Sequence, residues 1–138
     1  DAGVIQNCRK AENGLYHITP NTLPIAWFEG VAWYRLGEPD TALQCFRKAL
    51  LSTPYEVRVL NDEATALFSL KKTEEAKSVL LKTLIIDPFF DDARFNLGAI
   101  YYFTGKRDSA LYYIRLCRNG PKKEEFLEEI NRIPAYPQ

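Results

Sequence analysis

Apolar side chains recur along this chain at the helical spacing of about 3.6 residues, with polar residues between them. The pattern is clearest in three segments that each carry one stripe of small, aliphatic and aromatic residues. The stripes are Ala42, Cys45, Phe46, Ala49 and Leu50; Ala76, Val79, Leu80, Thr83 and Leu84; and Ala110, Tyr113, Ile114 and Cys117. A less regular apolar segment precedes each stripe. The pattern therefore predicts an all-α fold of paired helices, at 24–36 with 39–52, 55–70 with 74–86, and 89–103 with 107–118.

The same residue types return every 34 residues. The recurring sets are Pro20, Pro54 and Pro88; Ala42, Ala76 and Ala110; and Gly30, Ala64 and Gly98. A fixed period of this length is typical of stacked helical repeats that share a continuous core. The small residues are expected to face one another where the paired helices approach most closely. Such a scaffold usually provides a binding surface rather than a catalytic site.

Glycine and proline mark the ends of the predicted helices. Gly37 and Gly105 suit the left-handed position that ends a helix, and Pro39 suits the first turn of the next one. In the middle repeat Lys71 stands where the other two have glycine, so this turn must form without it. Thr73 is predicted to be the N-cap of the following helix.

The two ends of the chain differ from its centre. We predict a degenerate N-terminal helical segment at 1–22, three repeats at 23–56, 57–90 and 91–120, and a capping helix with a Pro-rich tail at 121–138. The C-terminal helix is charged, with Phe126, Leu127, Ile130 and Ile133 as its apolar side. The terminal repeat of a stacked array needs a polar outer face, which this helix supplies. Residues Val4 to Ile18 fit the second helix of a preceding repeat.

These residues and their phase resemble the tetratricopeptide repeat (TPR) family, a 34-residue helix–turn–helix. The tract Ala93-Arg-Phe-Asn-Leu-Gly-Ala-Ile-Tyr-Tyr102 is especially similar to the first helix of that family. The chain departs from the family pattern at Glu29 and Glu63, where leucine is usual, and at Lys71, where glycine is usual. The resemblance implies a right-handed superhelix in which the first helices line a concave groove.

By this resemblance, certain first-helix positions face the groove. They are Trp27, Val31, Tyr34, Arg58, Asn61, Thr65, Phe95, Asn96 and Tyr102. We expect Trp27, Tyr34 and Phe95 to be exposed anchors whose truncation costs less than about 1 kcal/mol of stability. The alternative is that some of these aromatics belong to the core. The TPR class that holds a C-terminal carboxylate uses lysine and asparagine at the positions of Trp27 and Val31, so the resemblance does not extend to that class.

Composition and motifs narrow the function further. Eighteen basic and eighteen acidic residues cancel, which gives no electrostatic reason to expect a nucleic-acid partner. A single histidine, His17, and three cysteines are too few for a metal cluster or a disulfide framework, and no phosphate-binding glycine motif is present. Asp87, Asp91 and Asp92 are interpreted as helix-capping residues rather than a metal site. The sequence therefore predicts neither an enzyme nor a cofactor-binding protein.

The predicted function is a scaffold that binds a peptide segment or a partner domain, which includes another domain of its own chain. The alternative is an accessory domain of a bacterial O-antigen polymerase/ligase-type membrane protein, suggested by the phrases Pro54-Tyr55 and Asp87-Pro88-Phe89. The chain opens at Asp1 and contains no methionine, which we interpret as a fragment of a longer protein. We expect a monomer or weak dimer without membrane insertion of its own, in the cytoplasm, or in the periplasm if it belongs to a membrane protein.

Overall fold

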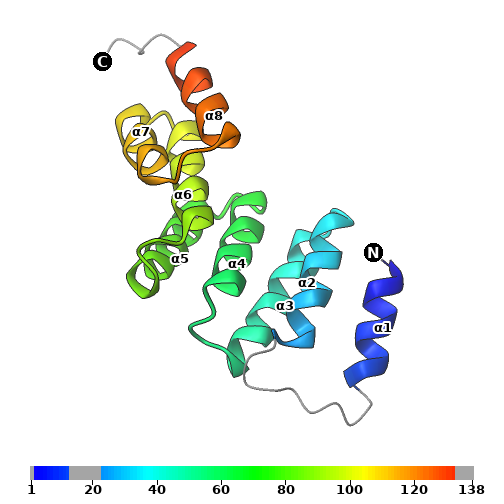
Figure 1. Ribbon diagram of the computed structural model, residues 1–138. Helices are drawn as coiled ribbons and strands as arrows, with labels where there is room; N and C mark the ends of the chain where they lie inside the picture. The colour runs from blue at the N-terminus through cyan, green and yellow to red at the C-terminus, as the bar shows by residue number, and fades with distance from the viewer. Residues whose placement is uncertain (1, 13–22, 133–138) are drawn as a thin grey trace. The chain divides into compact units, whose positions relative to one another are not determined.

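A computed structural model describes residues 2–12 and 23–132, and within these ranges every regular element is an α-helix (Figure 1). The helices are α1 (Ala2–Glu12), α2 (Ile25–Arg35), α3 (Pro39–Ser52), α4 (Val57–Ser69), α5 (Thr73–Ile86), α6 (Asp91–Phe103), α7 (Arg107–Leu116) and α8 (Pro121–Arg132). The expected all-α class is confirmed. No helix in the described part of the chain is both long and apolar enough to span a bilayer.

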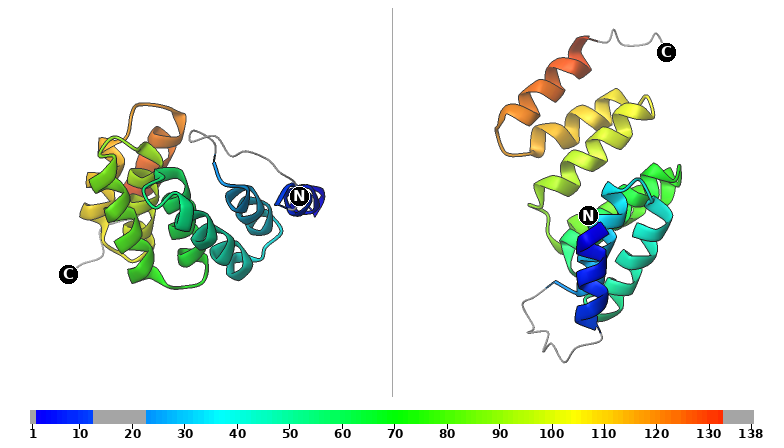
Figure 2. Two further views of the ribbon diagram at one scale, coloured as in Figure 1. Left: turned by 90° about the horizontal axis from the view of Figure 1, so that it is seen from below. Right: turned by 90° about the vertical axis from the view of Figure 1, so that its right-hand side faces the viewer.

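The chain forms two compact units that divide within α5, between Val79 and Leu80. In the first unit α1 packs beside α2, α2 on α3, and α3 on α4. In the second unit α6 packs on α7, and α7 on α8 (Figure 2). Each unit has its own buried side chains, and the largest are Phe46, Val59 and Leu67 in the first and Leu80, Leu97, Ile114 and Ile130 in the second.

Helices in a pair approach closely at a glycine. A Cβ atom on Gly30 would lie 2.5 Å from Cε1 of Phe46, and one on Gly98 would lie 2.6 Å from Cδ1 of Ile114. The expected partners of these glycines were Ala42 and Ala110, so this expectation needs correction. The nearest side chains lie one turn further along the same stripe, because those longer side chains reach back over the glycine. For Gly98, the carbonyl oxygen of Ala110 follows at 3.4 Å, so the expected alanine is also close.

The three turns inside the repeats share one hydrogen-bonding pattern. After α2, the N–H of Gly37 bonds to the carbonyl of Tyr34, and the N–H of Glu38 to that of Trp33. The same pair of bonds follows α4 and α6, in each case around a residue with positive φ: Gly37 at 82°, Lys71 at 64° and Gly105 at 77°. This is the Schellman arrangement, which satisfies carbonyls at the end of a helix. Lys71 therefore adopts the left-handed conformation that its two counterparts reach with glycine.

Replacing Lys71 with glycine is expected to stabilise the chain. A left-handed non-glycine residue costs about 1–2 kcal/mol, and part of this gain is offset by the greater freedom of glycine in the unfolded chain. We expect Lys71→Gly to raise the free energy of unfolding by about 0.5–1 kcal/mol in urea titrations. Lys71→Ala removes the same side chain but keeps the strain, so it serves as the control. Equal stability of the two variants would contradict the explanation.

Several helix ends differ from the predicted ones. Helices α4 and α6 begin at Val57 and Asp91, two residues later than predicted, because Pro54–Tyr55 and Pro88–Phe89 lie in turns. The helix α5 includes Thr73 as its first residue, so Thr73 is not the N-cap. The helix α7 ends at Leu116 and Cys117 is extended. Residues Pro20, His17 and Ile133 and the Pro-rich tail, on which predictions were made, lie outside the described residues, and so does the side chain of Cys8.

Two glutamates occupy positions where the family usually has leucine, and both are buried. Glu63 accepts a hydrogen bond from Nε of Arg47 at 3.1 Å, and the same guanidinium lies 3.7 Å from the carboxylate of Glu75. A buried carboxylate is costly unless it is paired, and Arg47 supplies that partner for Glu63. Glu29 is the second of these buried residues.

Candidate functional site

The first unit contains a cavity of about 310 Å³ between α2 and α4. Its walls come from Trp27, Val31, Tyr34 and Arg35 on α2 and from Asp62 and Thr65 on α4, with Phe46 of α3 also contributing. Phe46 is only 1% exposed, so it forms the floor. The lining is mainly aromatic and aliphatic with a few polar groups, which is the usual composition of a site that binds a ligand.

Two hydrogen bonds hold the aromatic rings at the rim of this cavity. The indole N–H of Trp27 donates to Oδ2 of Asp62 at 2.7 Å. The hydroxyl of Tyr34 lies 2.8 Å from Oγ of Ser69. Both bonds join α2 to α4, so the two rings are fixed to neighbouring helices. A ligand therefore meets rings that are already positioned, which reduces the entropy lost on binding.

Two charged residues line the cavity, and of the two only Asp62 forms a side-chain hydrogen bond to another described residue. Arg35 is exposed, and among the described residues no carboxylate or carbonyl pairs with its guanidinium. Asp62 is half-buried and holds Trp27. An anionic group of a ligand would thus find a partner at Arg35. Neither Asp62 nor Phe46 was among the predicted groove residues, although Asp62 directly follows Asn61, the residue one repeat length after Trp27.

Four of the predicted groove residues line this cavity, namely Trp27, Val31, Tyr34 and Thr65. The other two predicted residues of the first unit lie elsewhere. Asn61 is 7% exposed, and its backbone carbonyl accepts a hydrogen bond from the hydroxyl of Thr65 at 3.0 Å. Arg58 is exposed and forms an ion pair with Glu56 at 3.0 Å. That pairing raises the pKa of Arg58 and lowers that of Glu56, in both cases chiefly through the side-chain hydrogen bond.

The predicted groove residues of the second unit are Phe95, Asn96 and Tyr102, and all three are half-buried on α6. The ring of Phe95 lies 5.1 Å from that of Phe126, and Nζ of Lys122 lies 3.9 Å above its face. Tyr102 contacts Phe126 at 5.4 Å and donates to Glu129 at 3.2 Å. Trp27, Tyr34 and Phe95 are all half-buried, so none of them is the exposed anchor that was expected, and Phe95 is in addition covered by α8. Its truncation is expected to lower stability rather than only binding.

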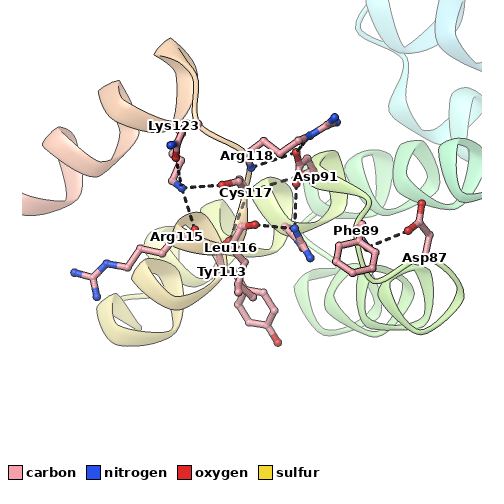
Figure 3. Close-up of polar contacts among 11 residues, drawn as sticks. Asp87, Phe89, Asp91, Tyr113, Arg115, Leu116, Cys117, Arg118 and Lys123 are labelled. Carbon is pink, nitrogen blue, oxygen red and sulfur yellow. Dashed lines mark hydrogen bonds and ion pairs between the residues drawn. The ribbon is translucent and has the colours of Figure 1, made fainter.

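Polar contacts around Asp91 connect the start of α6 to the end of α7 (Figure 3). The carboxylate of Asp91 forms ion pairs with Arg94 at 3.2 Å and with Arg118 at 2.6 Å. Arg94 also donates to the carbonyl of Leu116 at 2.7 Å. Partial burial alone would raise the pKa of Asp91, but the hydrogen bonds and charge of Arg118 hold it below its ordinary value. Arg94 is thus engaged within the chain.

Lys123 completes this cluster from α8. Its Nζ donates to the carbonyls of Arg115 and Cys117 at 2.9 and 2.7 Å, and to the side chain of Asn119 at 3.1 Å (Figure 3). Cations that bind the last carbonyls of a helix also complement its dipole. Together with Asp87, which accepts from the N–H of Phe89 at 2.9 Å, these contacts are structural. Within 2–12 and 23–132 no group of acidic, histidine or cysteine side chains is arranged as a metal site.

The two cysteines with described side chains, Cys45 and Cys117, are free thiols. Cys117 is buried, and its thiol contacts the carbonyls of Asp91 and Tyr113 at 3.7 and 3.5 Å. Burial raises the pKa of the Cys117 thiol, and the charge of Asp91 adds to the effect. A protonated, buried thiol is a poor nucleophile. Cys45 is half-buried rather than fully buried.

Comparisons with known proteins agree with the repeat pattern. The fold superposes on the first TPR domain of Spaghetti (RPAP3) in complex with an HSP90 peptide, with a TM-score of 0.73 and 22% identity over 86% of this chain and 97% of that one. The chain has the fold of a tetratricopeptide repeat array. A TPR protein of Thermus thermophilus, TTC0263, gives a TM-score of 0.78 at 18% identity, over 93% of this chain and 71% of that one. No family model matches the sequence.

Sequence comparison also finds TPR proteins. The TPR and J domain-containing co-chaperone DNJ1 of Fusarium oxysporum is 32% identical over 92 residues, which is 67% of this chain and 18% of the co-chaperone. This TPR chain thus spans less than a fifth of that curated relative. The predicted resemblance to TPR proteins is confirmed, while the fainter resemblance to bacterial polymerase or ligase tails gains no support from these proteins.

Proposed function

We propose that this TPR chain is a non-catalytic interaction module that holds a peptide segment of a partner protein at the cavity between α2 and α4. The observation that carries the proposal is the preorganised pair of rings, Trp27 and Tyr34, around an open cavity with Phe46 as its floor. Aromatic residues in such positions are the usual hot spots of protein interfaces. The solved relative that holds an HSP90 peptide supports a peptide as ligand.

The chemistry of the cavity defines the segment further. Its volume of about 310 Å³ accepts one large apolar side chain, and Arg35 at the rim favours a carboxylate beside it. Trp27, Val31 and Asp62 offer no lysine or asparagine for a terminal carboxylate, and Asp62 is itself an anion. The proposed ligand is therefore an internal segment with an apolar residue next to an acidic one, and not the end of a chain.

A selection from displayed random peptides tests this proposal. Peptides with an apolar–acidic pair should be enriched on the wild-type chain, and Trp27→Ala should weaken the best of them by about 2 kcal/mol, or roughly 30-fold. Binding should not change when the peptide's C-terminus is amidated. The HSP90 peptide SRMEEVD, the ligand of the solved relative, contains such apolar–acidic pairs, and amidation of its C-terminus should not change its binding to this chain.

The control removes an exposed aromatic ring outside the cavity, Tyr55→Ala, and should bind like the wild type. Circular dichroism must show that the Trp27 variant is folded, because loss of the bond to Asp62 costs some stability. Enriched peptides that bind Trp27→Ala as tightly as the wild type would place the site elsewhere. Tight binding that requires a free C-terminal carboxylate would overturn the proposed ligand class.

A further inference from the structure

The exposed face of α7 differs in character from the same face of the preceding second helices. Two outward positions, 34 residues apart in each repeat, hold Gln44 and Lys48 in α3, Ser78 and Lys82 in α5, and Tyr112 and Leu116 in α7. All six residues are exposed. In α7 alone both positions are apolar, with Tyr112 60% and Leu116 44% exposed. The last helix pair of an array would be expected to have a polar outer surface, so this replacement needs another explanation.

These two side chains border a shallow depression of about 330 Å³. It is lined by Asp108, Leu111, Tyr112, Arg115 and Leu116, which are spaced at one face of α7. The ring of Tyr112 contacts Tyr113 edge-on at 5.1 Å, and Tyr113 stacks on Tyr101 at 5.6 Å. The exposed tyrosine is therefore supported from below by two further rings. A rigid aromatic beside aliphatic side chains is typical of an interface anchor.

An arginine in this face has lost the partners that its counterpart has. Arg47 of α3, two repeat lengths before Arg115, pairs with Glu63 and lies 3.7 Å from Glu75 at the start of α5. Among the described residues, none pairs with the guanidinium of Arg115, and only its carbonyl is used, by Lys123. Glu75, the carboxylate that α5 presents to Arg47 of α3, lies in the first turn of α5.

We propose that the face formed by Asp108, Leu111, Tyr112, Arg115 and Leu116 docks an amphipathic helix of a partner protein, with an acidic residue in its first turn paired to Arg115. The apolar side of that helix covers Tyr112 and Leu116. Charge complementarity selects the helix and its direction, because the depression has a cation, Arg115, and an anion, Asp108, so the acidic residue must lie at Arg115 and away from Asp108. This surface is separate from the cavity between α2 and α4 and does not depend on its proposed function.

A synthetic peptide with the sequence of residues 72–86 is the probe, since it contains α5 and its Glu75. Its ends are blocked, and it is titrated into the isotope-labelled full chain while amide shifts are followed by NMR. A short helix is only marginally stable alone, so the expected affinity is weak. Saturable shifts are expected in α7 around Tyr112 and Arg115. Tyr112→Ala should abolish them.

Charge reversal provides the decisive comparison. Arg115→Glu should weaken binding at least fivefold, and a peptide with Glu75→Lys should restore it on that variant. Arg132→Glu makes the same change of charge on the exposed side of α8 and should have no effect. Shifts outside α7, equal effects of the two reversals, or no restoration would overturn the proposal. Self-association of the free chain that Tyr112→Ala removes would also overturn it, because a second copy would then occupy this face.

Discussion

Gly98→Leu is expected to lower the free energy of unfolding by about 3 kcal/mol, at the upper end of the range for overpacked cores. The physical reason is the approach of α6 to α7. Even a single added Cβ would lie 2.6 Å from Cδ1 and 2.8 Å from Cγ1 of Ile114, which is itself fully buried. A leucine adds three more carbons in the same direction, so the helices must separate. Urea titration monitored by circular dichroism measures the loss.

A smaller substitution shows whether this contact is the cause. Gly98→Ala gains helix propensity but meets Ile114, whereas Gly98→Ala combined with Ile114→Val removes the Cδ1 that it meets. The double variant should be more stable than the sum of the two single effects predicts. Strict additivity of the two changes, or an unchanged midpoint for Gly98→Leu, would mean that the assumed contact between α6 and α7 is not present.

Much of this fold could be predicted from local chemistry that repeats. The left-handed residue at each turn is glycine twice, and the spacing of 34 residues then places Lys71 in the same conformation. The helical stripe likewise predicted the burial of Phe46, Leu80 and Ile114. Such features depend on residues close in sequence, so a pattern can specify them.

The error at Phe95 shows where the sequence is insufficient. Its position in the repeat equals that of Trp27, so the resemblance assigned both to one groove. Their surroundings differ because α8 lies over Phe95 through Phe126 and Lys122, whereas Trp27 meets Asp62 at the edge of a cavity. Which side of a terminal helix docks, and on what, depends on contacts between distant segments. The repeat pattern carries no information about those contacts.

The same limit applies to the charged residues. Arg58 and Arg94 both lie near the start of a first helix, yet Arg58 pairs locally with Glu56 and Arg94 reaches Leu116 at the end of α7. Arg47 and Arg115 occupy the same position two repeats apart, and only Arg47 has carboxylate partners among the described residues. The same repeat position therefore holds a structural ion pair at Arg47 and, within the described part of the chain, an exposed, unpaired charge at Arg115. Each proposal relies on one of the exposed charges: Arg35 at the cavity between α2 and α4, and Arg115 on the face of α7.

Ile130→Ala is expected to destabilise the chain by about 3 kcal/mol, within the range for deletion of a buried isoleucine side chain. Ile130 is 1% exposed and packs with Ala110 and Ile114, with Phe95 and Phe126 beside them. We propose on this basis that α8 caps the array, as the sequence suggested, so the variant should also expose apolar surface and bind a hydrophobic dye. Glu128→Ala, on the exposed side of α8, should change stability by less than about 0.5 kcal/mol. An Ile130 variant as stable as Glu128→Ala, and free of dye binding, would show that α8 does not protect the end of the core.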